Sequence, residues 1–69
     1  MPSGSIKWFS ERRHYGFIVA ESGQEVFFHE SEVSAEDMPV HKGDQVIFKL
    51  IETSRGVQGK EIFKLPSPL

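Results

Sequence analysis

The sequence predicts an all-β fold, a small five-stranded antiparallel barrel formed by a single domain. Short apolar runs are separated by turn residues at the intervals that are typical of such a barrel. No window carries an apolar stripe with the helical period over the length of a helix. The chain has 69 residues, which suits one domain with a small core. We therefore expect one domain over residues 1–69, with its core at about 4–65.

The first three strands follow from runs rich in aromatic and β-branched residues. We expect the first strand at Ser5–Ser10, the second at Tyr15–Ala20 and the third at Glu25–His29. The segment Glu21–Gln24 contains serine and glycine and is expected to form the turn between the second and third strands.

A long connection, Glu30–Gly43, follows the third strand and has no sustained period, apart from one expected helical turn around Ser34–Met38. The fourth strand is expected at Gln45–Ile51 and the fifth at Gln58–Leu65. The residues Thr53–Gly56 between them suit a hairpin turn, because their glycine can adopt positive φ. Two prolines, which cannot donate to a strand ladder, are expected to end the last strand: Pro66 and Pro68.

Alternation along the strands divides their side chains into an inner and an outer set, because successive residues of a strand point to opposite faces. The expected interior contains Ile6, Ile18, Val26, Phe28, Val33, Val46, Phe48, Leu50 and Ile62. The outer set contains Tyr15, Phe17, Phe27 and His29. A barrel of this size cannot fill its interior from both faces, and the outer aromatic residues therefore indicate a binding surface.

The segment Arg13–Val19 is close to the RNP1 pattern of nucleic-acid-binding domains, a basic residue followed by aromatic, glycine, aromatic and aliphatic residues. Tyr15 and Phe17 lie two positions apart and so form neighbouring platforms on one face of a strand. Gly16 between them keeps the opposite side of the strand small, where the barrel wall curves tightly. Bases stack on such platforms at about 1–3 kcal/mol each.

A second run, Val26–His29, resembles RNP2 and places two more rings on the next strand. Together with RNP1, three further segments resemble the cold-shock domain in order and spacing: Gly4–Phe9, Lys42–Val46 and Arg55–Gly56. The resemblance covers the chain from Gly4 to about Leu65. It implies a bacterial-type cold-shock protein, an OB-fold barrel that binds single-stranded RNA or DNA and acts as an RNA chaperone.

The resemblance also implies which residues line the binding surface. They are the positions that match the family's contact residues: Lys7, Trp8, Phe9, Arg13, Tyr15, Phe17, Phe27, His29 and Arg55. Strict alternation would place Lys7 and Phe9 on one face and Trp8 on the other. If Trp8 stacks on bases, the first strand must bulge or coil sharply near Lys7.

Three residues depart from the family pattern. His14 stands where the family usually has glycine, and it must adopt positive φ at some cost or add another stacking ring. Glu30 and Met38 stand at or near further family aromatics. His14 and Met38 are secondary candidates for the site. The loss of two platforms lowers the expected affinity by roughly a few kcal/mol at most.

The net charge of −2 argues against binding of duplex DNA by charge alone. Residues 1–20 and 45–69 are mildly basic, however, and the excess of acidic residues lies between them. A single strand can still bind if stacking supplies much of the free energy. We expect pyrimidine-rich single-stranded RNA or DNA as the partner, and a monomeric protein.

Several classes of function are not expected. The chain has no cysteine, and its three histidines match no common zinc spacing, so we expect no metal. No phosphate-cradling glycine motif is present, so no cofactor is expected and any chaperone action is passive. Two alternative classes of function compete with nucleic-acid binding. One is a protein-interaction barrel of the SH3 or Tudor kind, and the other is a small hydrolase, although no nucleophile and base have credible spacing.

The expected location is the cytoplasm. No stretch is apolar and long enough to cross a bilayer, and residues 1–5 do not begin a secretory signal.

Overall fold

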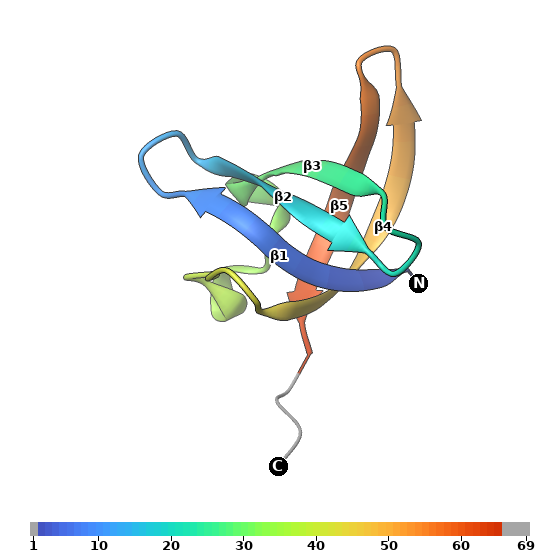
Figure 1. The fold of residues 1–69 in the computed structure, drawn as a ribbon. Coiled ribbons are helices and arrows are strands. Elements are labelled where there is room, and N and C mark those ends of the chain that lie inside the picture. Colours follow the sequence, from blue (N-terminus) through green and yellow to red (C-terminus); the bar gives the residue numbers. More distant parts are fainter. Residues whose placement is uncertain (1, 66–69) are drawn as a thin grey trace.

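The computed structural model describes residues 2–65 and contains the five strands that the sequence predicts (Figure 1). The elements in chain order are β1 (Ser3–Ser10), β2 (Tyr15–Ala20), β3 (Glu25–His29), the short 3-10 helices η1 (Glu30–Glu32) and η2 (Ala35–Asp37), β4 (Gln45–Thr53) and β5 (Gly56–Lys64). The strands close into a barrel in the order β1-β2-β3-β5-β4. Neighbouring strands are antiparallel except β3 and β5, which pair in parallel at Phe27 and Gln58.

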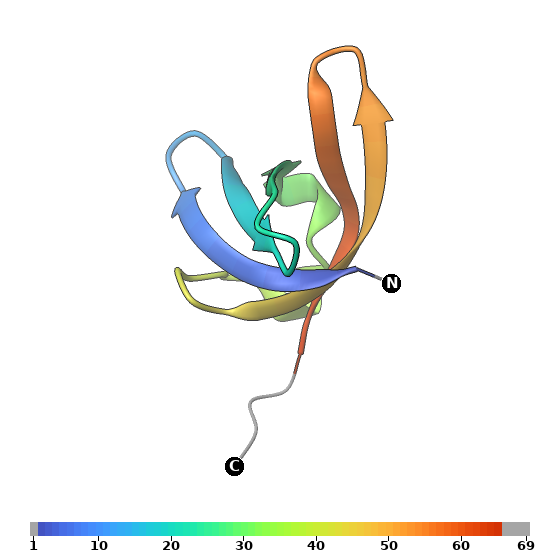
Figure 2. The same cartoon turned by 45° about the vertical axis from the view of Figure 1, so that its right-hand side comes forward.

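The bounds of β2 and β3 are those that the sequence predicts, whereas β4 and β5 are longer at their shared turn. The extra residues form a hairpin that projects beyond the rest of the barrel (Figures 1 and 2). Gly56 begins β5 with φ of 117°, a value that glycine adopts without a steric penalty. Pro66 and Pro68, which were expected to end the last strand, lie outside the described residues.

The connection between β3 and β4 contains two short helices, where the sequence predicted one helical turn. The connection is fixed to β5 at several points. Val33 forms an isolated parallel bridge with Ile62, and the backbone N–H of Lys64 donates a hydrogen bond to Asp37 at 3.1 Å. It therefore lies against the barrel and contributes residues to the core.

Nine buried hydrophobic residues form the core of the described chain, and eight of them are predicted: Ile6, Ile18, Val26, Phe28, Val33, Val46, Phe48 and Ile62. The ninth is Val40, which alternation could not find because it lies in the irregular connection.

The prediction that Leu50 lies inside is wrong, because its side chain is 37% exposed. Leu50 follows Val46 and Phe48 in alternation, but it lies past a shift in the β4–β5 register. β5 has one extra residue between the pairs Ile47–Phe63 and Lys49–Lys60. Glu61, with φ of 50°, lies within this bulge. Beyond it the β4–β5 hairpin projects from the rest of the barrel (Figure 2), and Leu50 in this part of β4 is exposed.

We expect Val40→Ala to lower the free energy of unfolding by about 2 kcal/mol, since it removes two buried carbon atoms and leaves a cavity. Leu50→Ala is expected to cost less than about 1 kcal/mol, because the leucine side chain is already partly in water. Urea denaturation of both variants, followed by circular dichroism, measures the two values. If Leu50→Ala proves the more destabilising change, the core assignment is wrong.

Candidate nucleic-acid interface

The bulge that the sequence predicts near Lys7 is present in β1. Ile6 pairs with Ile18, but Trp8 pairs with Phe17, so Lys7 is an extra residue without an opposite partner in β2. Ile6 before the bulge is buried, whereas Trp8 after it is 44% exposed. The bulge thus turns the indole to the outer side of the barrel, where strict alternation would not place it.

Four aromatic side chains lie together on the outer side of β1, β2 and β3. Trp8, Phe17 and Phe27 lie opposite one another on adjacent strands, and Tyr15 lies two residues before Phe17 on β2. The centroids of neighbouring rings are 5.4–6.3 Å apart, which makes the four rings one continuous surface. We call these four residues the aromatic face.

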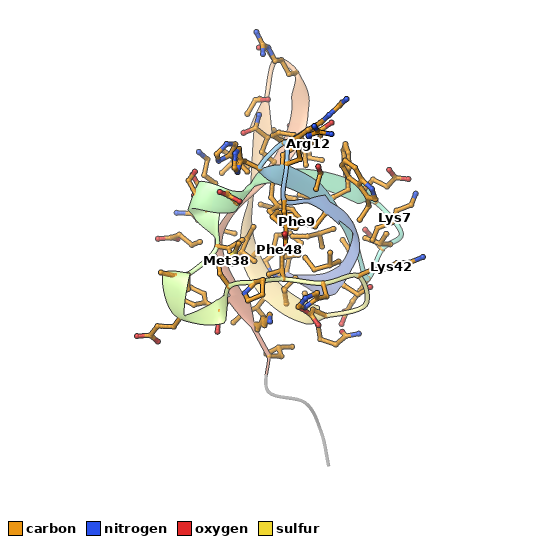
Figure 3. All side chains as sticks on the ribbon, turned by 90° about the vertical axis from the view of Figure 1, so that its left-hand side faces the viewer. Lys7, Phe9, Arg12, Met38, Lys42 and Phe48 are labelled. Carbon is orange, nitrogen blue, oxygen red and sulfur yellow. The ribbon has the colours of Figure 1, made fainter. Side chains whose placement is uncertain are left out.

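Phe9 does not belong to the aromatic face. Its ring packs parallel to that of the buried Phe28, with centroids 5.9 Å apart and an interplanar angle of 9°. Met38 is also partly buried against the core, and Figure 3 shows both residues at the end of the barrel where Phe48 lies inside. Both residues therefore contribute to core packing, and their contact with nucleic acid stays a prediction.

The three predicted basic residues differ in their surroundings. The Lys7 Nζ lies 2.6 Å from the Glu25 Oε2, and both side chains are about half exposed. For Arg13 and Arg55, the structure gives hydrogen bonds of the backbone N–H but no side-chain partner among residues 2–65. Lys7 must therefore exchange a carboxylate for a phosphate if it contacts a strand, whereas the two arginines need no such exchange.

His14 adopts positive φ, at 64°, as its place in the family pattern suggested. Its Nδ1 lies 2.9 Å from the Oε1 of Glu30, and the Glu30 N–H donates a hydrogen bond to the His14 carbonyl at 2.8 Å. Two of the residues that depart from the family pattern thus contact each other. They link the turn between β1 and β2 to η1.

His29 is exposed at the end of β3, beside Tyr15 in the β2–β3 register. Its Nδ1 accepts a hydrogen bond from the backbone N–H of Ser31 at 3.1 Å and lies 2.9 Å from the Ser31 hydroxyl. The imidazole therefore caps η1. Because Nδ1 acts as an acceptor, the proton of the neutral ring is on Nε2, which leaves an N–H donor for a ligand.

A groove adjoins the aromatic face on the side of the β4–β5 hairpin. Its larger part has a volume of about 550 Å³ and an adjoining part about 360 Å³, and both are lined by Phe17, Phe27, Arg55 and Val57. The larger part is also lined by Gln24, Glu25, Glu52, Thr53 and Gly56, and the smaller part by Gln58.

Sequence reasoning did not assign most of these groove residues to the site. Glu52, Val57 and Gln58 come from the hairpin, which reaches the aromatic face through the parallel pairing of β3 with β5. That pairing joins segments about thirty residues apart in the sequence, and no local sequence pattern predicts it. Arg55, predicted as a site residue from the resemblance, and Gly56, predicted in the hairpin turn, were the local signals that this turn approaches the site.

The described part of the chain contains neither a cluster of metal-ligating side chains nor a helix that could span a membrane. Residues 2–65 contain no group of three or more His, Cys, Asp or Glu side chains that could hold a metal ion. Within the same residues, no helix has the length and apolar character needed to span a membrane.

Comparisons with known proteins agree on one family. A family model described as the 'Cold-shock' DNA-binding domain matches residues 2–65. Cold shock-like protein CspLB of Listeria monocytogenes is 36% identical over 66 residues, which cover 94% of this chain and 100% of that protein. Cold shock protein CspB of Bacillus caldolyticus is 35% identical with the same coverage. Among solved structures, Drosophila Unr CSD456 matches with a TM-score of 0.78 and 29% identity, over 94% of this chain and 26% of that one.

Proposed function

This chain belongs to the cold-shock domain family, and we propose that it binds single-stranded RNA or DNA by stacking bases on Trp8, Tyr15, Phe17 and Phe27. The observation that carries the proposal is the continuity of the aromatic face. Its four rings lie on the opposite side of the strands from the core, so packing of the barrel does not require them. Rings with free faces accept any base, because every base has a π surface.

The family binds nucleic acid and does not catalyse a reaction, which agrees with the prediction that the chain is not an enzyme. As the mechanism of chaperone action, we propose passive trapping. Unpaired bases stack on the aromatic face and cannot re-form weak pairs while they are bound. The family assignment and the position of the basic residues at the site argue against the SH3-like or Tudor-like alternative.

Basic residues at both ends of the aromatic face are proposed to hold the strand. Arg13 follows β1, in the turn that leads into Tyr15, and Arg55 lies in the turn between β4 and β5, beside Phe17 and Phe27. Lys7 already has a carboxylate partner. Its contact with a phosphate would replace that ion pair and would therefore contribute little additional free energy of binding. Stacking is therefore proposed as the main contribution, with phosphate contacts as the smaller one.

Further features of the proposal follow from the fold. Pyrimidine-rich strands are the proposed ligands, because sequence preferences at stacking sites reflect base stacking and backbone flexibility. A monomer is proposed, since closure of the barrel pairs the strands that would otherwise offer edges.

The barrel built from residues 2–65 supports a single domain over residues 1–69, and the absence of cysteine fits a cytoplasmic location.

Titration of the Trp8 fluorescence with heptathymidine and heptauridine tests the proposal, since Trp8 is the only tryptophan. We expect saturable quenching, because a base stacked on the indole changes its surroundings. A heptamer lies within the length that one OB fold covers. The titration is repeated at several salt concentrations from low to high. A plot of the logarithm of the association constant against the logarithm of the salt concentration is expected to have a shallow slope of about −1 to −2, equivalent to about two phosphate contacts. If no quenching is seen and no competitor binding is detected, the proposed function is wrong.

A further inference from the structure

The groove beside the aromatic face combines two aromatic rings with a carboxylate that has no partner among the residues that the structure describes. Phe17 and Phe27 line one side of the groove, and Glu52 lines it from β4. Within residues 2–65, the structure gives the Glu52 side chain no hydrogen bond or ion pair. Glu25, the other carboxylate in the groove, already lies 2.6 Å from the Lys7 Nζ. Glu52 is thus the acceptor that is available to a ligand.

These walls suit a base better than a phosphate. The Glu52 carboxylate repels a phosphate group, and Glu25 is already paired with Lys7, while the rings of Phe17 and Phe27 can stack on a base. Arg55 lines the same groove, and its positive charge offsets part of the repulsion that the phosphates of an incoming strand would meet. A strand on the aromatic face can therefore place one base in the groove and leave its phosphates outside.

The free carboxylate also selects among the bases. An ionised carboxylate binds most strongly to two parallel N–H donors, as in its pairing with arginine. Guanine is the one standard base with two adjacent donors on its Watson–Crick edge, at N1 and at the N2 amine. Adenine and cytosine place a ring acceptor next to their amine. Uracil and thymine flank their single N–H with carbonyl oxygens that repel the second carboxylate oxygen.

We propose that the groove between β3 and the β4–β5 hairpin is a guanine subsite, with Glu52 accepting hydrogen bonds from N1–H and the N2 amine. The inference rests on the proposed function, because it assumes a strand on the aromatic face. It adds a preference at one position of an otherwise sequence-tolerant site. A pyrimidine-rich strand with a single guanine is then a better ligand than a pure pyrimidine strand.

The test is a set of thymidine heptamers in which guanine replaces each thymine in turn. Dissociation constants are taken from Trp8 fluorescence, with heptathymidine as the reference. We expect guanine at one or two adjacent positions to tighten binding about tenfold, the effect of one bidentate contact to a base. Inosine at the same position lacks the N2 amine and is expected to lose most of the gain, although its ring still stacks. Adenine there controls for purine stacking and is expected to resemble inosine.

Two variants assign the effect to the residue. Glu52→Ala is expected to bind guanine-containing and pure thymidine heptamers equally well. Glu36→Ala removes an exposed carboxylate on η2, outside the groove, and is expected to retain the preference. If heptathymidine binds but no guanine position gains, or if the gain survives in Glu52→Ala, the subsite is wrong while the proposed function stands. If no heptamer binds at all, the proposed function itself is overturned.

Discussion

Replacing Phe17 and Phe27 together by alanine is expected to weaken the binding of heptathymidine at least about thirtyfold. Each ring that stacks on a base contributes roughly 1–3 kcal/mol, and the two contributions add when they serve neighbouring bases. Phe17 and Phe27 pair across β2 and β3, with ring centroids 5.9 Å apart, on the part of the aromatic face that lines the groove. Their loss separates Trp8 from the groove. Trp8 fluorescence titration measures the change directly.

A folded double variant is needed for this result to report on binding. Both phenylalanines lie on the opposite side of the strands from the core, so the barrel is expected to persist, which thermal unfolding by circular dichroism checks. Phe63→Ala is the matched control, because Phe63 is 44% exposed and lies opposite Ile47, outside the aromatic face. The Phe63→Ala substitution also removes a phenyl ring, and this variant is expected to bind heptathymidine as tightly as the unsubstituted protein does. If the double variant binds like Phe63→Ala, the bases stack elsewhere.

Replacing Gly16 by alanine is expected to lower the free energy of unfolding by about 3 kcal/mol, at the upper end of the usual cost of overpacking. A Cβ at this position would lie 2.3 Å from the Trp8 carbonyl oxygen and 3.0 Å from the Phe9 Cα. Both are backbone atoms of the paired strand β1, so no side-chain rotation relieves the clash. In a domain of this size, the loss corresponds to a melting temperature lower by about 15 °C.

Gly59→Ala is the matched control for Gly16→Ala. Gly59 is also buried in a strand, but a Cβ there would meet only side-chain atoms of Val26, Phe48 and Ile18, at 3.4–3.7 Å. These are ordinary contact distances, so we expect a change within about 1 kcal/mol. Thermal unfolding of both variants gives the comparison. Equal stability of the two would mean that β1 does not approach β2 as closely at Gly16 as the structure indicates.

The Gly16 result would also connect the fold to the site. Gly16 separates Tyr15 from Phe17 on the aromatic face, while its own inner side permits the close approach of β1 just after the Lys7 bulge. The same approach brings Trp8 beside Phe17. The glycine between Tyr15 and Phe17 therefore matches the RNP1 pattern and is also required for the close packing of β1 against β2.

Local alternation in the sequence was enough to predict the strands and most of the core. The run Tyr15–Ala20 could be assigned residue by residue, and the separation of Phe28 from Phe27 followed from the pleat of one strand. The same alternation exposed a conflict at Trp8, and its solution, a bulge at Lys7, is present. Where the pattern is locally consistent, burial of apolar side chains leaves one choice of face.

Features that depend on contacts between distant segments could not be predicted from local patterns. Leu50 continues the inner alternation of β4 but is exposed, because past the β5 bulge the β4–β5 hairpin projects from the rest of the barrel (Figure 2). Val40 is buried because its connection lies across an end of the barrel, and Lys7 is engaged because the β2–β3 turn brings Glu25 to it. The groove with Glu52 exists because β5 pairs with β3 across the barrel. Side-chain direction is a local property of a strand, whereas the partner that covers or occupies a side chain depends on closure of the whole sheet.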